Sequence, residues 1–118
     1  MTYDKNNIFA KILRGEIPCK KVFENDHVLA FHDINPQKKV HVLVIPKGEY
    51  VDLDDFNNKA SDKEIIELNR ALTHVASLMG TKNKGYRALT NIGNDGGQEV
   101  PHLHFHIFAG EKIGKMVS

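Results

Sequence analysis

Three histidines, His102, His104 and His106, occupy alternate positions directly after a glycine-rich turn, in the stretch GNDGGQEVPHLHFHIF. Successive side chains of a β-strand point to opposite faces, so this spacing predicts three imidazoles on one face of a strand. The apolar residues between them would then face the hydrophobic core; these are Leu103, Phe105 and Ile107. The first question is which chemistry needs imidazoles in such a row.

Imidazole side chains in a row suit chemistry at phosphorus. A neutral imidazole is a nucleophile, whereas a protonated one binds a phosphate oxygen or gives a proton to a leaving group. The ordinary histidine pKa is about 6.5 and neighbouring positive charges repel, so a mixture of neutral and protonated rings is expected near neutral pH. One strand would then supply both the nucleophile and the acid.

The turn before the histidines contains Gly93, Gly96 and Gly97. Glycine permits positive φ angles and a close approach of main-chain N–H groups to an anion. Neither the P-loop pattern nor the Gly-x-Gly-x-x-Gly dinucleotide pattern is present in the chain. The turn therefore favours phosphate binding only because of its position beside the histidines.

Two alternatives compete with phosphoryl chemistry at this point. Zinc needs each ligating nitrogen at about 2.0–2.1 Å, so two neighbouring histidines, about 6.5–7 Å apart at Cα, can share one ion, but three in a row, with the outer two about 13 Å apart, cannot easily converge on it. A zinc site would therefore need His41 or a carboxylate from another strand. The other alternative is three exposed histidines on a solvated face, with no site at all.

Length and composition predict one globular domain spanning residues 1–118, with 41% hydrophobic and 26% charged residues. Sixteen basic and fifteen acidic side chains give a net charge of +1, so no overall field would attract nucleic acid or an anionic membrane. Cys19 is the only cysteine, which excludes an internal disulfide framework and favours a reducing compartment. The polar start and the absence of a bilayer-length apolar run lead us to expect a soluble, cytoplasmic protein.

Two helices are predicted from apolar periodicity. A short amphipathic helix places Ile8, Phe9, Ile12 and Leu13 on one face and ends before Gly15. The long helix covers residues 61–79, with a Ser-x-x-Glu capping box at its start and a glycine directly after its end. The acidic stretch at residues 52–55 is predicted to be a solvated loop or a helix start without a functional role.

Five strands are predicted, over residues 20–24, 28–34, 40–46, 86–91 and 103–108. Short turns separate the first three strands, which favours antiparallel neighbours. The fold class is therefore α+β, with a five-stranded antiparallel sheet, one long helix and one short helix.

The motif His102-Leu103-His104-Phe105-His106-Ile107-Phe108 resembles the signature of the histidine triad (HIT) family. The preceding Gly-Gly-Gln-Glu-Val stretch, residues 96–100, resembles the branch of histidine triad nucleotide-binding proteins. Further stretches at residues 8–12, 17–18, 30–37 and 41–47 are similar to the same branch, in the same order. The resemblance thus extends over nearly the whole chain.

The resemblance implies an α+β fold whose five-stranded sheet pairs in a homodimer to give ten strands. It implies hydrolysis of purine nucleoside phosphoramidates and aminoacyl adenylates, which releases AMP or GMP without a metal or another cofactor. Within the family, dinucleoside polyphosphate hydrolysis is an alternative. A nucleotide-binding regulatory module with incidental turnover is another, because binding needs the same pocket.

Residue roles are also implied by the resemblance. His104 would attack the α-phosphorus and become transiently nucleotidylated. His102 would orient that ring, partly through its main-chain carbonyl, with His41 packed behind, and His106 would contact the α-phosphate. Asp33 would accept hydrogen bonds from the ribose hydroxyls.

The rest of the nucleotide-binding set is likewise implied by position. The phosphate side would be lined by Asn91, Gly97, Gln98 and Val100. The base would be enclosed by Ile8, Phe9, Ile12, Phe31 and Ile34. Glu99 completes the set; it stands where eukaryotic members carry a serine, and bacterial members often have a glutamate there.

Overall fold

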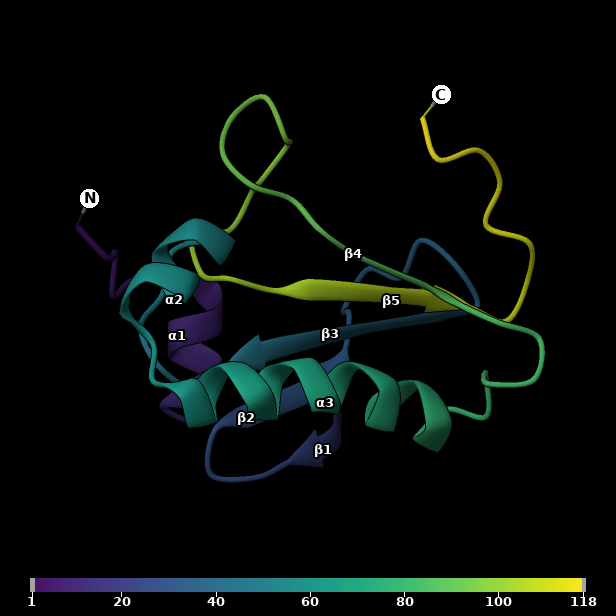
Figure 1. The fold of residues 1–118 in the computed structure, drawn as a ribbon, viewed down its shortest axis with the longest axis horizontal. Coiled ribbons are helices and arrows are strands. Elements are labelled where there is room, and N and C mark those ends of the chain that lie inside the picture. Colours follow the sequence, from purple (N-terminus) through teal and green to yellow (C-terminus); the bar gives the residue numbers. More distant parts are fainter. Residues whose placement is uncertain (1, 118) are drawn as a thin grey trace.

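A five-stranded antiparallel sheet organises the protein, which is described here by a computed structural model covering residues 2–117 (Figure 1). The strand order is β1-β2-β3-β5-β4. The strands are β1 (Lys21–Glu24), β2 (Val28–His32), β3 (Val40–Pro46), β4 (Arg87–Thr90) and β5 (Phe105–Ala109). The helices are α1 (Ile8–Leu13), α2 (Leu53–Lys59) and α3 (Asp62–Leu78). The predicted α+β class and the five antiparallel strands are confirmed.

Both faces of the sheet are covered, because the central strands carry apolar side chains on both sides. On one face, α3 packs against the sheet over a core that includes Val28, Val44 and Ile107 (Figure 1). On the other face, Phe9 of α1 packs over Leu29, Phe31, Leu43 and Ile45. Successive residues of β2 and β3 alternate between these two cores, as strand geometry requires.

The start of α3 is a complete capping box, as the sequence predicts. The Ser61 hydroxyl accepts a hydrogen bond from the Glu64 main-chain N–H at 3.2 Å, and a Glu64 carboxylate oxygen accepts one from the Ser61 N–H at 3.0 Å. Gly80 follows the helix with a φ of 71°. None of the helices in residues 2–117 combines the length and the apolar character needed to cross a membrane.

The acidic stretch at residues 52–55 begins the short helix α2, and a helix start is one of the two structures predicted for it; the rest of the helix is not predicted. Asp52 caps it by accepting a hydrogen bond from the Asp55 N–H at 2.8 Å. Phe56 is the one buried side chain in α2. A single buried residue leaves no apolar stripe, so periodicity could not reveal the helix.

The last strand begins later than the sequence predicts, and two of the three histidines precede it. β5 starts at Phe105, so of the row only His106 belongs to the strand. The main chain before it has other partners: the Leu103 N–H donates to the Tyr50 carbonyl at 2.8 Å, and the Thr90 hydroxyl donates to the His104 carbonyl at 2.7 Å. These contacts hold the segment next to the sheet without extending the ladder.

Removing the Ser61 cap should destabilise the protein. We expect Ser61→Ala to lower the free energy of unfolding by about 1 kcal/mol, because it leaves a helix N–H without its acceptor. Urea denaturation followed by circular dichroism measures the change. Ser77→Ala, near the end of the same helix, is the matched control; equal effects of the two substitutions would contradict a stabilising role for the cap.

Candidate active site

A cavity of about 510 Å³ lies on the face of the sheet that carries α1. It brings together much of the predicted site from distant parts of the chain. The predicted residues that line it are Phe9, Asp33, His41, Asn91, Gly97, Glu99, Val100, His104 and His106. Segments from α1, the end of β2, β3, the glycine loop and β5 therefore meet at one place, which the sequence resemblance implied but could not show.

Six predicted residues do not line this cavity: Ile8, Ile12, Phe31, Ile34, Gln98 and His102. Phe31 is buried beneath Phe9, with the ring centroids 5.7 Å apart, and Ile34 is 94% exposed. His102 is fully buried behind the cavity wall. Of the five residues predicted to enclose the base, only Phe9 lines this cavity.

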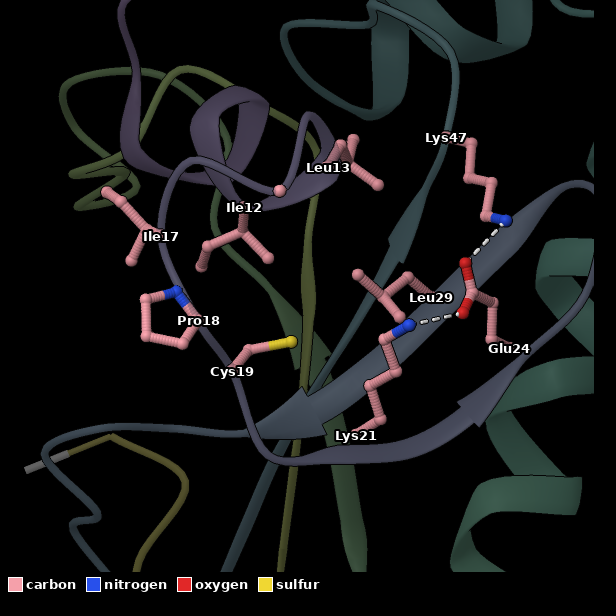
Figure 2. Close-up of a pocket in the computed structure, with 10 residues that line it drawn as sticks. Ile12, Leu13, Ile17, Pro18, Cys19, Lys21, Glu24, Leu29 and Lys47 are labelled. Atoms are coloured by element: carbon pink, nitrogen blue, oxygen red, sulfur yellow. Dashed lines mark hydrogen bonds and ion pairs between the residues drawn. The ribbon is translucent and has the colours of Figure 1, made fainter.

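Ile12 instead lines a second cavity, of about 450 Å³, at the C-terminal end of α1 (Figure 2). Its wall is apolar on the helix side, and its far edge holds Glu24 between Lys21 and Lys47, at 2.8 and 2.7 Å. Cys19 also lines it, and burial raises the pKa of this thiol. The sulfur is therefore not an activated nucleophile.

The partner of His104 leaves one of its ring nitrogens free for chemistry. His104 Nδ1 lies 2.8 Å from the main-chain carbonyl of His102, and a carbonyl can only accept, so Nδ1 carries the proton. The Nε2 atom of the neutral ring then holds the lone pair. The predicted contact through the His102 carbonyl is present, and it makes Nε2 of His104 the available nucleophilic atom.

His41 lies behind His106 rather than behind the pair His102 and His104. The Gln37 main-chain N–H donates to His41 Nδ1 at 3.1 Å, so the other nitrogen of the neutral ring, Nε2, carries the proton. That Nε2–H donates to His106 Nδ1 at 2.9 Å and lies 3.4 Å from a carboxylate oxygen of Asp33. His106 is therefore left with its own proton on Nε2, as a hydrogen-bond donor.

The only group of potential metal ligands in residues 2–117 consists of Asp33, His41 and His106, whose ligand atoms lie within 4.8 Å of one another. The spacing is compatible with zinc, but the hydrogen bonds are not. A metal on His41 Nε2 would put the proton on Nδ1, against the Gln37 N–H, whereas a metal-bound histidine needs an acceptor at its second nitrogen. The arrangement therefore disfavours the zinc hypothesis.

Burial keeps the imidazoles neutral. It lowers the pKa of His102 to about 4 and that of His106 to about 4, and it lowers the pKa of His104 and His41 as well. The expected mixture of neutral and protonated rings at neutral pH is therefore wrong for the free protein, because desolvation is the largest influence on each ring and disfavours its charged form. The alternative of three solvated histidines is also wrong, since His102 is 0% and His104 6% exposed.

The glycine loop is held by its own polar side chains. Gly93 and Gly97 have φ angles of 68° and 77°, and a Cβ on Gly96 would meet the Ile92 carbonyl oxygen at 2.2 Å. The Gln98 carboxamide donates to the carbonyls of Val51 and Val100 and accepts from the Gly93 N–H. Gln98 therefore shapes the loop from outside the cavity, while Gly97 lines it.

Five lining residues escaped the sequence analysis: Asn35, Gln37, Leu43, Leu89 and Phe108. Phe108 stacks on His106 with an interplanar angle of 4° and a centroid distance of 5.4 Å. Its alternation with His106 along the strand was an available signal for this placement. Gln37 contributes its main-chain N–H to His41, which no side-chain pattern reveals.

The buried neutral rings should make stability depend on pH. Below about pH 6.5 the histidines of the unfolded chain bind protons, whereas His102 and His106 in the folded protein stay neutral until about pH 4. The free energy of unfolding should therefore fall progressively between pH 6.5 and pH 4. For His102 the loss by pH 5 should be about 2 kcal/mol. Urea denaturation at pH 7 and pH 5 measures it. His102→Asn should flatten the dependence and exposed His32→Asn should not; an equal slope in all three proteins would contradict the interpretation.

Comparisons with known proteins agree with the geometry. The HIT domain family matches residues 14–113. A 13.2 kDa HIT-like protein of Azospirillum brasilense is 61% identical over 117 residues, covering 99% of this chain and 96% of the relative. A histidine triad protein from Clostridium difficile has a TM-score of 0.84 at 43% identity, covering 97% of this chain and 98% of that one. A HIT family hydrolase from Clostridium thermocellum has a TM-score of 0.88 at 36% identity, covering 98% and 99%. The chain belongs to the HIT domain family.

Proposed function

We propose that this protein is a hydrolase that cleaves the P–N or acyl-phosphate bond of purine nucleoside phosphoramidates or aminoacyl adenylates and releases AMP or GMP. The observation that carries the proposal is the 2.8 Å contact between His104 Nδ1 and the His102 main-chain carbonyl. The Nδ1–H of His104 is committed to that carbonyl, so a neutral nucleophilic Nε2 is left on a ring that lines the cavity. The solved relative from Clostridium thermocellum, described as a HIT family hydrolase, supports the same class of activity.

The first step forms a bond between His104 Nε2 and the α-phosphorus, while the bond from phosphorus to the leaving nitrogen or acyl oxygen breaks. The leaving group keeps the bonding electron pair: a carboxylate leaves as the anion, and an amine takes up a proton from water as it leaves. The His104 ring becomes positively charged, and the His102 carbonyl stabilises that charge through the Nδ1–H contact. His106, with its proton on Nε2, is the donor assigned to the α-phosphate oxygens.

The second step hydrolyses the nucleotidyl-histidine. Water attacks phosphorus, the P–Nε2 bond breaks with its electron pair returning to the ring, and the attacking water gives up one proton to the surrounding solvent. A phosphorus bonded to imidazole has a good leaving group, so two lower barriers replace one. By the family resemblance, Asp33 would contact the ribose, Asn91, Gly97 and Val100 the phosphate side, and Phe9 the base; that all five line the same cavity supports these roles.

A homodimer that continues the sheet is part of this proposal. β4 is an edge strand of the sheet, and an edge strand presents main-chain N–H and C=O groups that another strand can pair with. Pairing of two β4 strands across a two-fold axis would give the ten strands expected from the family resemblance. Light scattering during size-exclusion chromatography should give a mass twice that of one chain; a monomer mass at micromolar concentration would contradict the dimer.

The activity should require His104 and no metal. With excess chelator present, we expect the wild-type protein to release AMP from adenosine 5′-phosphoramidate and His104→Ala to lose at least about a thousandfold in kcat, because the variant lacks the attacking nitrogen. Liquid chromatography of the nucleotide products measures both. His32→Ala, at the exposed end of β2, is the matched control and should retain wild-type turnover.

The same assay separates the proposal from its alternatives. Loss of wild-type activity under chelation, with recovery on adding zinc, would support a zinc hydrolase instead. Tight AMP binding without turnover would support a regulatory nucleotide-binding module. Much faster turnover of diadenosine polyphosphates than of the phosphoramidate would identify a dinucleoside polyphosphate hydrolase.

A further inference from the structure

Tyr3 lies outside residues 14–113, the part of the chain that matches the HIT domain family, yet it contacts the histidine cluster. Its hydroxyl oxygen is 2.6 Å from His102 Nδ1, across 99 positions of the sequence. The two rings also meet edge to face, with centroids 5.6 Å apart. The proposed mechanism assigns no role to this residue.

The direction of the Tyr3 contact follows from the other nitrogen of the same ring. His102 Nε2 lies 2.9 Å from the Pro46 main-chain carbonyl, which can only accept, so Nε2 carries the proton of the neutral ring. His102 Nδ1 is then an acceptor, and the Tyr3 hydroxyl is its donor. Burial also raises the pKa of the Tyr3 phenol, which keeps the hydroxyl protonated at neutral pH.

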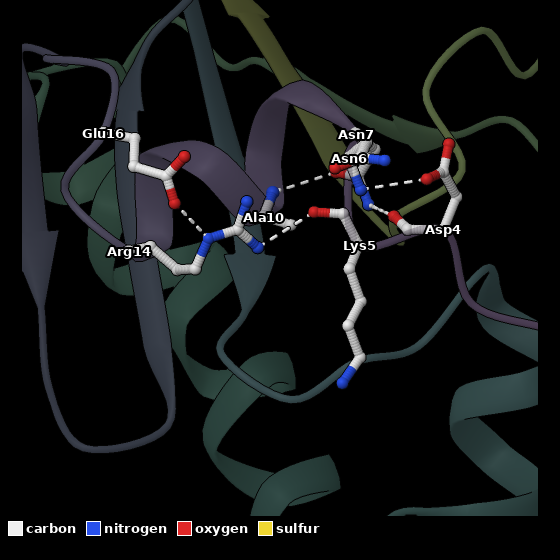
Figure 3. A network of polar contacts seen from close by, with 7 residues as sticks. All are labelled: Asp4, Lys5, Asn6, Asn7, Ala10, Arg14 and Glu16. Carbon is white, nitrogen blue, oxygen red and sulfur yellow. Dashed lines mark hydrogen bonds and ion pairs between the residues drawn. The ribbon is translucent and has the colours of Figure 1, made fainter.

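The segment that carries Tyr3 is anchored to α1 (Figure 3). The Asp4 carbonyl accepts hydrogen bonds from the Asn7 main-chain N–H at 3.2 Å and from the Asn7 side-chain amide at 2.7 Å, while Asn7 caps α1 through the Ala10 N–H at 2.9 Å. The Arg14 guanidinium, at the other end of α1, donates to the Lys5 carbonyl at 2.9 Å. These contacts fix the main chain directly after Tyr3.

We propose that Tyr3 is a positioning residue for the nucleophile, acting through His102. The Tyr3 hydroxyl and the Pro46 carbonyl hold the two nitrogens of the His102 ring, and the main chain of the same residue presents its carbonyl to His104 Nδ1 at 2.8 Å. Fixing the ring at both nitrogens fixes where that carbonyl points. The catalytic meaning of this contact rests on the function proposed above, whereas the contact itself does not.

Phe9 adds a second contact from the same N-terminal region. Its ring meets His104 edge to face, with centroids 4.9 Å apart, and it lies 6.3 Å from the His102 ring.

Tyr3 does not line the cavity, so removing its hydroxyl takes no contact away from a bound nucleotide. The expected effect is on the rate of the chemical step and not on substrate binding.

Nuclear magnetic resonance of the imidazole nitrogens tests the contact without any assay of activity. In the wild-type protein we expect His102 to carry its proton on Nε2, with the Nδ1 resonance shifted as a hydrogen-bond acceptor. In Tyr3→Phe the Nδ1 resonance should move to the position of an unbonded nitrogen. Solvent exchange of the His104 Nδ1 proton should become about tenfold faster, because its acceptor is less firmly held.

Kinetics on adenosine 5′-phosphoramidate tests the catalytic consequence. Tyr3→Phe should lower kcat about tenfold and leave KM within about twofold. Tyr50→Phe is the matched control, since it also removes a hydroxyl hydrogen bond, to Glu64 at 2.8 Å, while keeping the main-chain carbonyl that accepts from the Leu103 N–H. Its kcat and its His102 resonances should stay at wild-type values.

Each result decides the proposal. A wild-type His102 protonated on Nδ1, unchanged His102 and His104 signals in Tyr3→Phe, or an unchanged kcat in an active enzyme would overturn it. Failure of the proposed function is distinguishable, because it would appear as an inactive wild-type protein, whereas the resonance measurements would still show whether Tyr3 holds His102 and protects the His104 proton.

Discussion

Burying neutral imidazoles is the constraint on which the rest of this site depends. A neutral imidazole has one donor and one acceptor nitrogen, and a buried polar atom without a partner is costly. Across residues 2–117, every buried side-chain nitrogen and oxygen has a hydrogen-bond partner. Each partner fixes which nitrogen carries the proton. Which nitrogen of His104 and of His106 carries the proton therefore follows from the groups next to each ring.

Those groups are mostly main-chain atoms, supplied from separate regions. The Pro46 carbonyl comes from the end of β3, the Gln37 N–H from the turn before that strand, and the His102 carbonyl from the segment before β5. A main-chain partner has the same chemistry whatever its side chain is. The protonation pattern therefore depends on the positions of β3, of the turn before it and of the segment before β5, and substitutions that shift these would disturb it without replacing a histidine.

The same hydrogen-bond pattern bears on the cluster of Asp33, His41 and His106. It favours a chain of hydrogen bonds there over a metal centre. Asp33, His41 and His106 converge closely enough for zinc, but a donor already faces His41 Nδ1. Ligand spacing alone would favour the opposite conclusion. In this protein the main-chain N–H that donates to His41 Nδ1, rather than the spacing of the three side chains, argues against a metal centre.

The sequence by itself determined much of the architecture. The apolar runs of β2 and β3, the alternation along β5, the Ser61 capping box and the apolar stripe of α3 are local signals, because each is set by residues close together in the sequence. The motif around His104 also identifies the family, and the glycines before it predict the turn in which Gly93 and Gly97 have positive φ angles. The helix α2 is not predicted beyond its start, since Phe56 is its one buried side chain.

Only the tertiary structure decided which rings are buried, which nitrogen of each is protonated, and which predicted residues share a cavity. The contact between Tyr3 and His102 joins residues 99 positions apart, and Ile34, predicted to enclose the base, is 94% exposed. Solvent exposure and hydrogen-bond direction depend on groups brought together by folding. A single sequence records the residue types in such a site, but their charge states are set by neighbours that only the folded chain supplies.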